Sequence, residues 1–192
     1  MKIVFFRQLL LDDVTRKWTA SQQLVYSHLL SQSILRLDCV FHRDGTSIDY
    51  TKVIDDYCDE RDEIDLWDFN VQTMSALLNL SRQNVYNCID FLRCKQYVND
   101  NCIYCPKDIV YHGYFELMTH TGLTKHLLIF YSWLIERGQN YGGAIDTFSY
   151  KLAELFGTNE SNIRTMLSRL SEKGYVKRIT TEDKRYGKLL IK

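Results

Sequence analysis

Residues 150–178 read YKLAELFGTNESNIRTMLSRLSEKGYVKR, in which two apolar segments are joined by Gly157-Thr158-Asn159. The apolar residues of the later segment recur at the three- and four-residue spacing of one buried helix face. They are Ile163, Met166, Leu167 and Leu170. The joining tripeptide supplies an N-cap, and Gly174 is a favourable residue for ending the helix. The segment therefore predicts a helix, a tight turn and a second helix that runs to Lys173.

The same pattern occurs 78 residues earlier in the chain. When Leu78–Val98 is written above Phe156–Val176 without a gap, residues of one class meet at the helix core positions. The pairs include Asn84 with Asn162, Val85 with Ile163, Ile89 with Leu167, and Leu92 with Leu170. Upstream the offset is 103 at Leu24-Val25 and 106 at Ile3–Phe5, so the first copy carries an insertion of about 25 residues. We expect two units, residues 1–107 with an insertion at about 38–67, and residues 108–192.

Each unit is expected to contain the same elements in the same order. A strand comes first (Lys2–Leu11 or Asp108–Met118), followed by a helix with a Thr or Ser start signal (Gln22–Leu37 or Lys125–Arg137, the latter stopped by Gly138). A short strand follows (Leu66–Asn70 or Ala144–Phe148), then a second helix (Val71–Leu80 or Ser149–Phe156). The third helix begins after Ser81 or Asn159, and the first copy ends at Gln96. A β-hairpin closes each unit (Tyr97–Asn99 with Cys102–Cys105, or Tyr175–Ile179 with Lys188–Ile191).

This order is that of a winged helix-turn-helix. Residues 150–178 resemble a bacterial winged-helix regulator. The first unit resembles the N-terminal winged helix of plasmid replication initiators, in its opening Ser21–Leu30, its Asp44-Gly45 hairpin and its later helix start Leu80–Val85. The resemblance implies a mainly α fold with small β elements (α+β), made of two tandem winged helix-turn-helix domains that bind DNA.

Composition places the chain among ordinary globular proteins, because 45% of its residues are apolar and 25% are charged. The longest apolar runs, such as Leu127–Tyr131, are too short to span a bilayer, and Arg7 interrupts the apolar start that a signal peptide needs. We therefore expect no membrane association, a cytoplasmic location and reduced cysteines.

Net charge is zero over the whole chain but is unevenly distributed. Residues 1–123 hold 12 Lys and Arg against 17 Asp and Glu, whereas residues 124–192 hold 12 against 7. The acidic excess lies in residues 49–68, which carry nine acids and only Lys52 and Arg61 as bases. A basic C-terminal third is typical of a protein with a polyanionic partner.

The candidate DNA contacts are the outward positions of the third helices and the basic hairpin. Side chains of Asn, Gln and Arg read base edges, and basic hairpin residues bind phosphates. In the second unit the candidates are Asn159, Ser161, Asn162, Arg164, Thr165, Ser168, Arg169, Lys177, Arg178, Lys184, Arg185 and Lys188. In the first unit they are Arg82, Gln83, Asn84, Tyr86 and Asn87. The alternative is that the charged hairpin is exposed to solvent and contacts no DNA.

Motifs for catalysis and for cofactors are weak. Cys102 and Cys105 have the spacing of a zinc pair, with Cys39 and His42 as the only matching partners, but they fall in an expected strand without the usual glycine turn. Cys88 and Cys94 lie on different faces of one helix, and Cys88 is expected in the core. The acidic stretch lacks the central glycine of a calcium loop. We expect no enzyme activity, no metal and no cofactor.

The sequence thus favours a sequence-specific protein for double-stranded DNA, acting in replication initiation of a mobile element or in transcriptional regulation. The alternative is a tandem winged-helix module for protein–protein interaction, as in chromosome-condensation accessory proteins. Zero net charge and the acidic insertion favour that alternative, because the insertion would offer a contact for a second copy or a basic partner.

Overall fold

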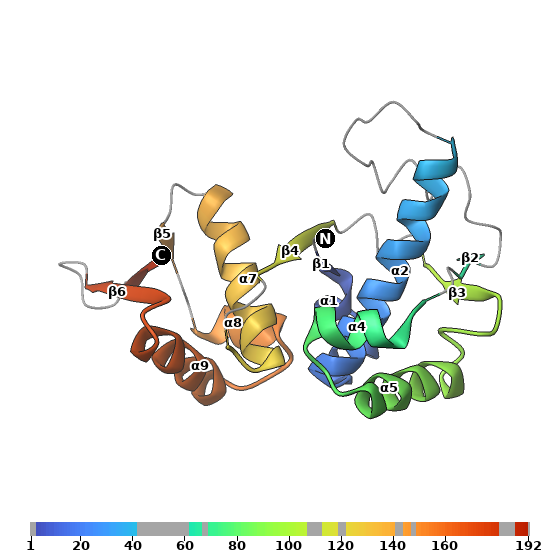
Figure 1. Ribbon diagram of the computed structural model, residues 1–192. Helices are drawn as coiled ribbons and strands as arrows, with labels where there is room; N and C mark the ends of the chain where they lie inside the picture. Colours follow the sequence, from blue (N-terminus) through green and yellow to red (C-terminus); the bar gives the residue numbers. More distant parts are fainter. Residues whose placement is uncertain are drawn as a thin grey trace. The chain divides into compact units, whose positions relative to one another are not determined.

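The computed structural model describes residues 3–41, 62–66, 69–106, 113–118, 122–140, 144–146, 149–180 and 187–191. These residues form a mainly helical protein with small antiparallel sheets, as the α+β expectation states (Figure 1). Contacts divide the chain into two compact units. One comprises Met1–Leu9 with Trp18–Tyr114, and the other Leu10–Lys17 with Phe115–Lys192. This division differs from the expected boundary at 107/108 in two ways, because residues 10–17 belong to the second unit and the first unit extends to Tyr114.

Helix α2 (Ala20–Phe41) is the central helix of the first unit. Thr19 begins it with a reciprocal capping box: its Oγ1 accepts from Gln22 N–H at 3.3 Å, and Gln22 Oε1 accepts from Thr19 N–H at 2.8 Å. The expected Thr start signal is therefore confirmed, although the helix begins two residues earlier and ends four residues later than predicted. Its buried apolar residues include Leu24, Val25, Tyr26, Leu29, Leu30 and Ile34.

The N-terminal strand is shorter than predicted. Strand β1 covers Ile3–Phe6, and Gln8–Leu11 forms the helical turn α1 instead of continuing the strand. Asp12 Oδ1 then accepts from the N–H groups of Val14 and Thr15, which turns the chain into the 3₁₀ helix η1 (Thr15–Lys17). An unbroken apolar run has no alternation, so its pattern alone does not separate a buried strand from a buried helical turn.

Helices α4 (Val71–Leu78) and α5 (Arg82–Cys94) both pack against α2 (Figure 1). Asn70 caps α4, since its Oδ1 accepts from Gln72 N–H at 2.8 Å and from Thr73 N–H at 3.1 Å. Ser81 caps α5 as predicted, because its Oγ accepts from Asn84 N–H at 3.2 Å. The buried face of α5 is also the predicted one: Val85, Cys88, Ile89 and Leu92.

An aromatic cluster joins the start of α2 to the hairpin that follows α5. Trp18 makes edge-to-face contacts with Tyr26, Phe91 and Tyr97, at centroid distances of 5.7, 5.4 and 4.6 Å. Tyr97 also contacts Tyr104 at 5.4 Å, and Tyr26 Oη donates to the Tyr104 carbonyl oxygen. Edge-to-face pairs add to the free energy gained by burial alone.

The small sheet of the first unit pairs β2 (Glu63–Asp65) with β3 (Cys102–Tyr104) in antiparallel register. The predicted strand at Leu66–Asn70 is wrong for its described residues, Leu66, Phe69 and Asn70, because the paired residues lie earlier and inside the segment expected to be an insertion. Trp67 and Asp68 lie outside the described residues. The buried Ile64 lies opposite the buried Ile103, and this pair sets the register. Leu66 only donates its N–H to the Asn101 carbonyl at 2.7 Å.

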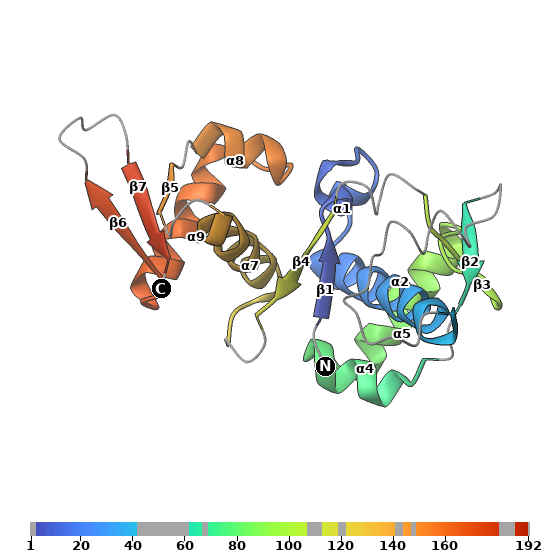
Figure 2. The ribbon, with the colours of Figure 1, turned by 90° about the horizontal axis from the view of Figure 1, so that it is seen from above.

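The second unit follows the same order of elements. Its elements are β4 (Tyr114–Leu117), α7 (Lys125–Asn140), β5 (Ala144–Asp146), α8 (Ser149–Leu155), α9 (Glu160–Glu172), β6 (Val176–Thr180) and β7 (Gly187–Ile191). The last three strands form an antiparallel sheet in the order β5-β7-β6 (Figure 2). Residues 108–112 of the expected strand, and Thr147 and Phe148, lie outside the described residues.

Gly138 does not end helix α7, which corrects the predicted stop. The glycine is buried where α7 packs on β7, and a Cβ there would lie 2.9 Å from Ile191 Cδ1. Its small size therefore serves close packing between helix and sheet, and its conformational freedom is not used to stop the helix.

The repeat is visible in hydrogen bonds as well as in sequence. At an offset of 78, α5 matches α9 from first residue to last, and Ser81 and Asn159 are both N-caps. Asn79 and Gly157, which follow α4 and α8, both have positive φ, and so do Gln96 and Gly174 after α5 and α9. In both third helices the last turn closes in the same way: Tyr97 N–H donates to Leu92 O, and Tyr175 N–H to Leu170 O, each at 2.9 Å.

Upstream, the equivalent residues differ from those of the sequence alignment. The buried Ser27 Oγ of α2 accepts from Phe6 N–H at 3.0 Å, and the buried Ser132 Oγ of α7 accepts from Met118 N–H at 2.9 Å. Ser27 and Ser132 are 105 residues apart, so the helices align two residues away from the predicted offset of 103. By the same bonds β1 matches β4, whereas residues 109–111, the predicted partner of β1, lie outside the described residues.

Candidate nucleic-acid interface

Helix α9 is held by a cap at its start and by a buried face along its length. Asn159 Oδ1 accepts from Asn162 N–H at 2.8 Å, and Gly157, at φ +58°, makes the tight turn from α8. The predicted core residues Ile163, Met166, Leu167 and Leu170 are all buried. The opposite face is exposed and carries the predicted contact residues Ser161, Asn162, Arg164, Thr165, Ser168 and Arg169.

Most of the polar groups on that face already have partners on the same helix or at its cap. Arg164 Nη2 lies 2.8 Å from Glu160 Oε2, and Ser168 Oγ donates to Glu172 Oε1 at 3.1 Å. Thr165 Oγ1 donates to the Ser161 carbonyl, and Asn162 Nδ2 donates to Thr158 Oγ1, both at 2.9 Å. Arg169 has no ion pair with any described residue. The face is therefore close to neutral, with Arg169 as its available cation.

Helix α5 exposes the five predicted side chains of the first unit. Arg82, Gln83, Asn84, Tyr86 and Asn87 are all exposed, and 51% of the Tyr86 surface is accessible. Gln83 Nε2 donates to Asn87 Oδ1 at 2.9 Å. The first turn of α5 contains no acid, whereas α9 has Glu160 in its first turn.

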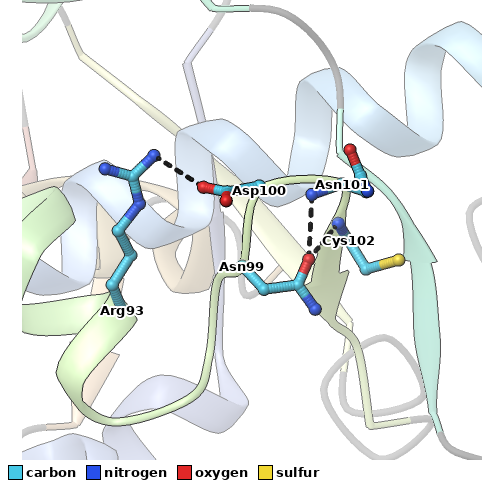
Figure 3. Close-up of polar contacts among 5 residues, drawn as sticks. All are labelled: Arg93, Asn99, Asp100, Asn101 and Cys102. Atoms are coloured by element: carbon cyan, nitrogen blue, oxygen red, sulfur yellow. Dashed lines mark hydrogen bonds and ion pairs between the residues drawn. The ribbon is translucent and has the colours of Figure 1, made fainter.

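The hairpin after α5 is tight and carries an acid at its tip. Asn99 N–H donates to the Cys102 carbonyl at 2.9 Å, while Asn99 Oδ1 accepts from Asn101 N–H at 2.9 Å and from Cys102 N–H at 2.6 Å (Figure 3). Asp100 is exposed and lies 3.4 Å from Arg93 Nη2 (Figure 3). This hairpin offers no unpaired positive charge to a phosphate.

The hairpin after α9 is longer. Its last described pair is Thr180 with Gly187, and residues 181–186 join the two strands. Lys177 is exposed on β6. Arg178 and Lys188 lie in β6 and β7, but their side chains, together with all of Lys184 and Arg185, fall outside the described residues.

The cysteines do not assemble a metal site within the part of the chain that the structure describes, where no three His, Cys, Asp or Glu side chains are placed to hold an ion. Cys88 is buried and Cys94 is exposed, which confirms that they lie on different faces of α5. Burial raises the pKa of the Cys88 thiol, so it stays protonated and unreactive. Cys105 is buried after β3, and its N–H donates to Asp62 O. The Cys39 side chain and His42 lie outside the described residues.

Sequence reasoning missed one titratable group in the core of the first unit. His28 is 5% exposed on α2, and its Nδ1 has no hydrogen-bond partner among the described residues. Burial lowers its pKa to about 4. The signal was present, because His28 lies within the run Leu24–Leu30, where apolar residues surround it in the sequence.

A shallow groove of about 480 Å³ lies in the second unit, beside α8. Its lining residues are Leu10, Leu11, Arg16, Tyr150, Lys151, Glu154 and Leu155. Two of them are large apolar side chains that remain accessible, Leu11 at 42% and Tyr150 at 54%. None of these lining residues belongs to α9, and the groove was not predicted from the sequence.

Comparison of the chain with protein-family models, with curated proteins and with solved structures found no match. Across the described ranges, none of the helices has both the length and the apolar composition that crossing a bilayer requires.

Proposed function

We propose that this chain is a sequence-specific binding protein for double-stranded DNA, built from two tandem winged helix-turn-helix units. The observation that carries the proposal is helix α9. It follows a tight turn from α8, buries one face, exposes Ser161, Asn162 and Arg169 on the other, and continues into an antiparallel hairpin. The matching arrangement of α4, α5 and β3 in the first unit supports the tandem interpretation.

In this proposal the N-terminal half of α9 enters a major groove, where amide and guanidinium groups meet base edges. The β6-β7 hairpin lies along the neighbouring backbone, and its basic residues bind phosphates. These residues are Lys177, Arg178, Lys184, Arg185 and Lys188. Such binding would serve replication initiation of a mobile element or transcriptional regulation, and it requires no catalytic group or cofactor.

Fluorescence anisotropy with a short labelled duplex tests the proposal. Because phosphate contacts release counterions, affinity falls steeply between about 50 and about 200 mM salt. Arg169→Ala lowers the slope of log affinity against log salt by about one, as expected for one lost phosphate contact. Arg93→Ala is the matched control: it removes an exposed arginine from the last turn of α5, where Asp100 already pairs with it.

A slope near zero for the wild-type protein, or an equal effect of both arginine variants, would contradict DNA binding by α9.

A protein–protein interaction module remains the second candidate, and two observations favour it. The Glu160–Arg164 pair makes the α9 face nearly neutral, and Leu11 and Tyr150 are accessible at the groove beside α8. If this is the function, the chain does not bind duplex DNA even at low salt. It instead co-purifies with a protein partner that Tyr150→Asp releases and Arg169→Ala does not.

A further inference from the structure

The exposed face of α5 carries two amide side chains that are already bonded to each other. Gln83 and Asn87 lie one helical turn apart, and Gln83 Nε2 donates to Asn87 Oδ1 at 2.9 Å. Neither amide has another hydrogen-bond partner among the described residues. Gln83 therefore keeps its carbonyl oxygen and one N–H for a ligand, while its other N–H holds the amide plane in place.

That pair of groups is complementary to one base. In the major groove adenine presents the N6 amino donor beside the N7 acceptor, which an amide meets with its oxygen and its N–H. Guanine presents two acceptors, O6 and N7, so the amide oxygen would face another oxygen there. Because Asn87 already orients the Gln83 amide, less side-chain entropy is lost when the base binds.

The charge around the pair fits a DNA partner better on α5 than on α9. The first turn of α5 contains Arg82 and no acid, and the first acid of the helix is Asp90. The position of α9 that matches Gln83 is Ser161, next to Glu160, whose carboxylate repels phosphates. The amide pair is thus a feature of the first unit only.

We propose that Gln83, positioned by Asn87, selects an adenine in the DNA site of this protein, so that α5 reads bases alongside α9. The inference rests on the proposed DNA-binding function and adds the base and the residue that reads it. The second unit keeps α9 in its own groove and supplies most of the phosphate contacts through its longer, basic hairpin.

Selection of bound duplexes from a random pool, followed by affinity measurements on the selected site, tests this assignment. The wild-type protein selects a site with an adenine that Gln83→Ala no longer prefers. The same variant binds the selected site about 10-fold more weakly and binds an unrelated duplex equally well. Gln83→Glu, which only accepts hydrogen bonds, shifts the preference at that position from adenine to cytosine, whose N4 amino group donates.

A base analogue in the DNA distinguishes a loss of adenine recognition from a loss of folded protein. Replacing the selected adenine by 7-deazaadenine removes the N7 acceptor and weakens wild-type binding, but leaves Gln83→Ala unchanged. Asn87→Ala lowers the adenine preference without changing the salt slope, as expected for a positioning residue. Ser161→Ala, the matched position on α9, leaves the adenine preference intact. The thermal unfolding midpoint of each variant is also measured. We expect it to equal that of the wild-type protein, because these side chains are exposed.

Two results would overturn the inference, and they are distinguishable. If the wild-type protein binds duplex DNA but Gln83→Ala keeps the preference for adenine, the assignment to Gln83 is wrong, whereas the proposed DNA-binding function is unaffected. If the wild-type protein binds no duplex at low salt, both the inference and the proposed function fall.

Discussion

Helices α5 and α9 share their buried faces and their caps but differ in the surfaces that they expose. α5 presents amides and a tyrosine with no acid in its first turn, whereas α9 presents hydroxyls and arginines beside Glu160. The hairpins that follow differ as well, since one is closed by Asn99 and the other is joined by residues 181–186. A repeated unit thus retains the contacts that hold it together while its outward residues diverge.

The same comparison extends to the first long helices. Aligned on Ser27 and Ser132, His28 of α2 matches Trp133 of α7. His28 is buried with Nδ1 unpartnered among the described residues, whereas Trp133 packs against Phe156 at 5.6 Å and lies under Arg137. The two units therefore bury different chemistry at one position, and their stabilities should respond differently to mutation and to pH.

The largest expected effect comes from the aromatic clusters. Trp18→Ala removes a ring that contacts three others and is expected to lower the free energy of unfolding by about 4 kcal/mol. Trp133→Ala removes a ring with one aromatic contact and one arginine, and is expected to cost about 3 kcal/mol. Urea unfolding of both variants measures the difference, and a larger loss for Trp133→Ala would reverse the comparison.

A smaller effect is expected from acid. The pKa of His28 is about 4 in the folded protein, whereas an exposed histidine has a pKa of 6.5, so the unfolded chain binds the proton first as pH falls. Stability is therefore present above about pH 6.5 and is lost as pH falls towards 4, by about 2.5 kcal/mol between pH 7.5 and 4.5.

Urea midpoints at the two pH values measure this loss, and His28→Leu is the matched variant because it has no proton to bind. The pH-dependent loss should shrink by most of that amount in His28→Leu. An unchanged loss would assign the acid sensitivity to other groups.

The smallest effect concerns the ends of the third helices. Gln96 and Gly174 occupy the same left-handed position, at φ +62° and +78°, but only glycine adopts it without steric cost. Gln96→Gly is expected to stabilise the protein by about 1 kcal/mol, and Gly174→Gln to destabilise it by about the same amount. Thermal unfolding of the two variants checks the opposite signs, and a shared sign would show that the two ends are not equivalent.

Local signals in the sequence were sufficient to predict the features that depend on residues within a single helix. The buried faces of α5 and α9, the cap at Ser81 and the different faces of Cys88 and Cys94 were predicted correctly. The caps Thr19 and Asn159 lie within the predicted start signals Thr19–Ser21 and Gly157–Asn159. These features depend on helical spacing and on hydrogen bonds over a few residues. The same spacing placed the candidate interface residues of both helices on exposed faces.

Contacts between distant residues were not predictable in the same way. The strand at Glu63–Asp65 depends on its partner 39 residues later, since Glu63 pairs with Tyr104 at one end and Asp65 with Cys102 at the other. Gly138 lies inside α7 at a point where Ile191 leaves no room for a side chain, so this glycine marks a packing contact and not a helix end. For residues that are close in sequence, helical spacing predicts that Gln83 and Asn87 are neighbours on α5, but it does not predict that they form a hydrogen bond.

By itself, the sequence determined that the chain contains a duplicated set of helices with apolar inner faces, because side-chain spacing along a helix is a local property. Only the tertiary structure decided which strands pair, which residues of α2 and α7 correspond, and which polar groups of α5 and α9 remain available to a partner. Those outcomes depend on packing between segments far apart in the chain, where a shift of one or two residues changes which side chains meet.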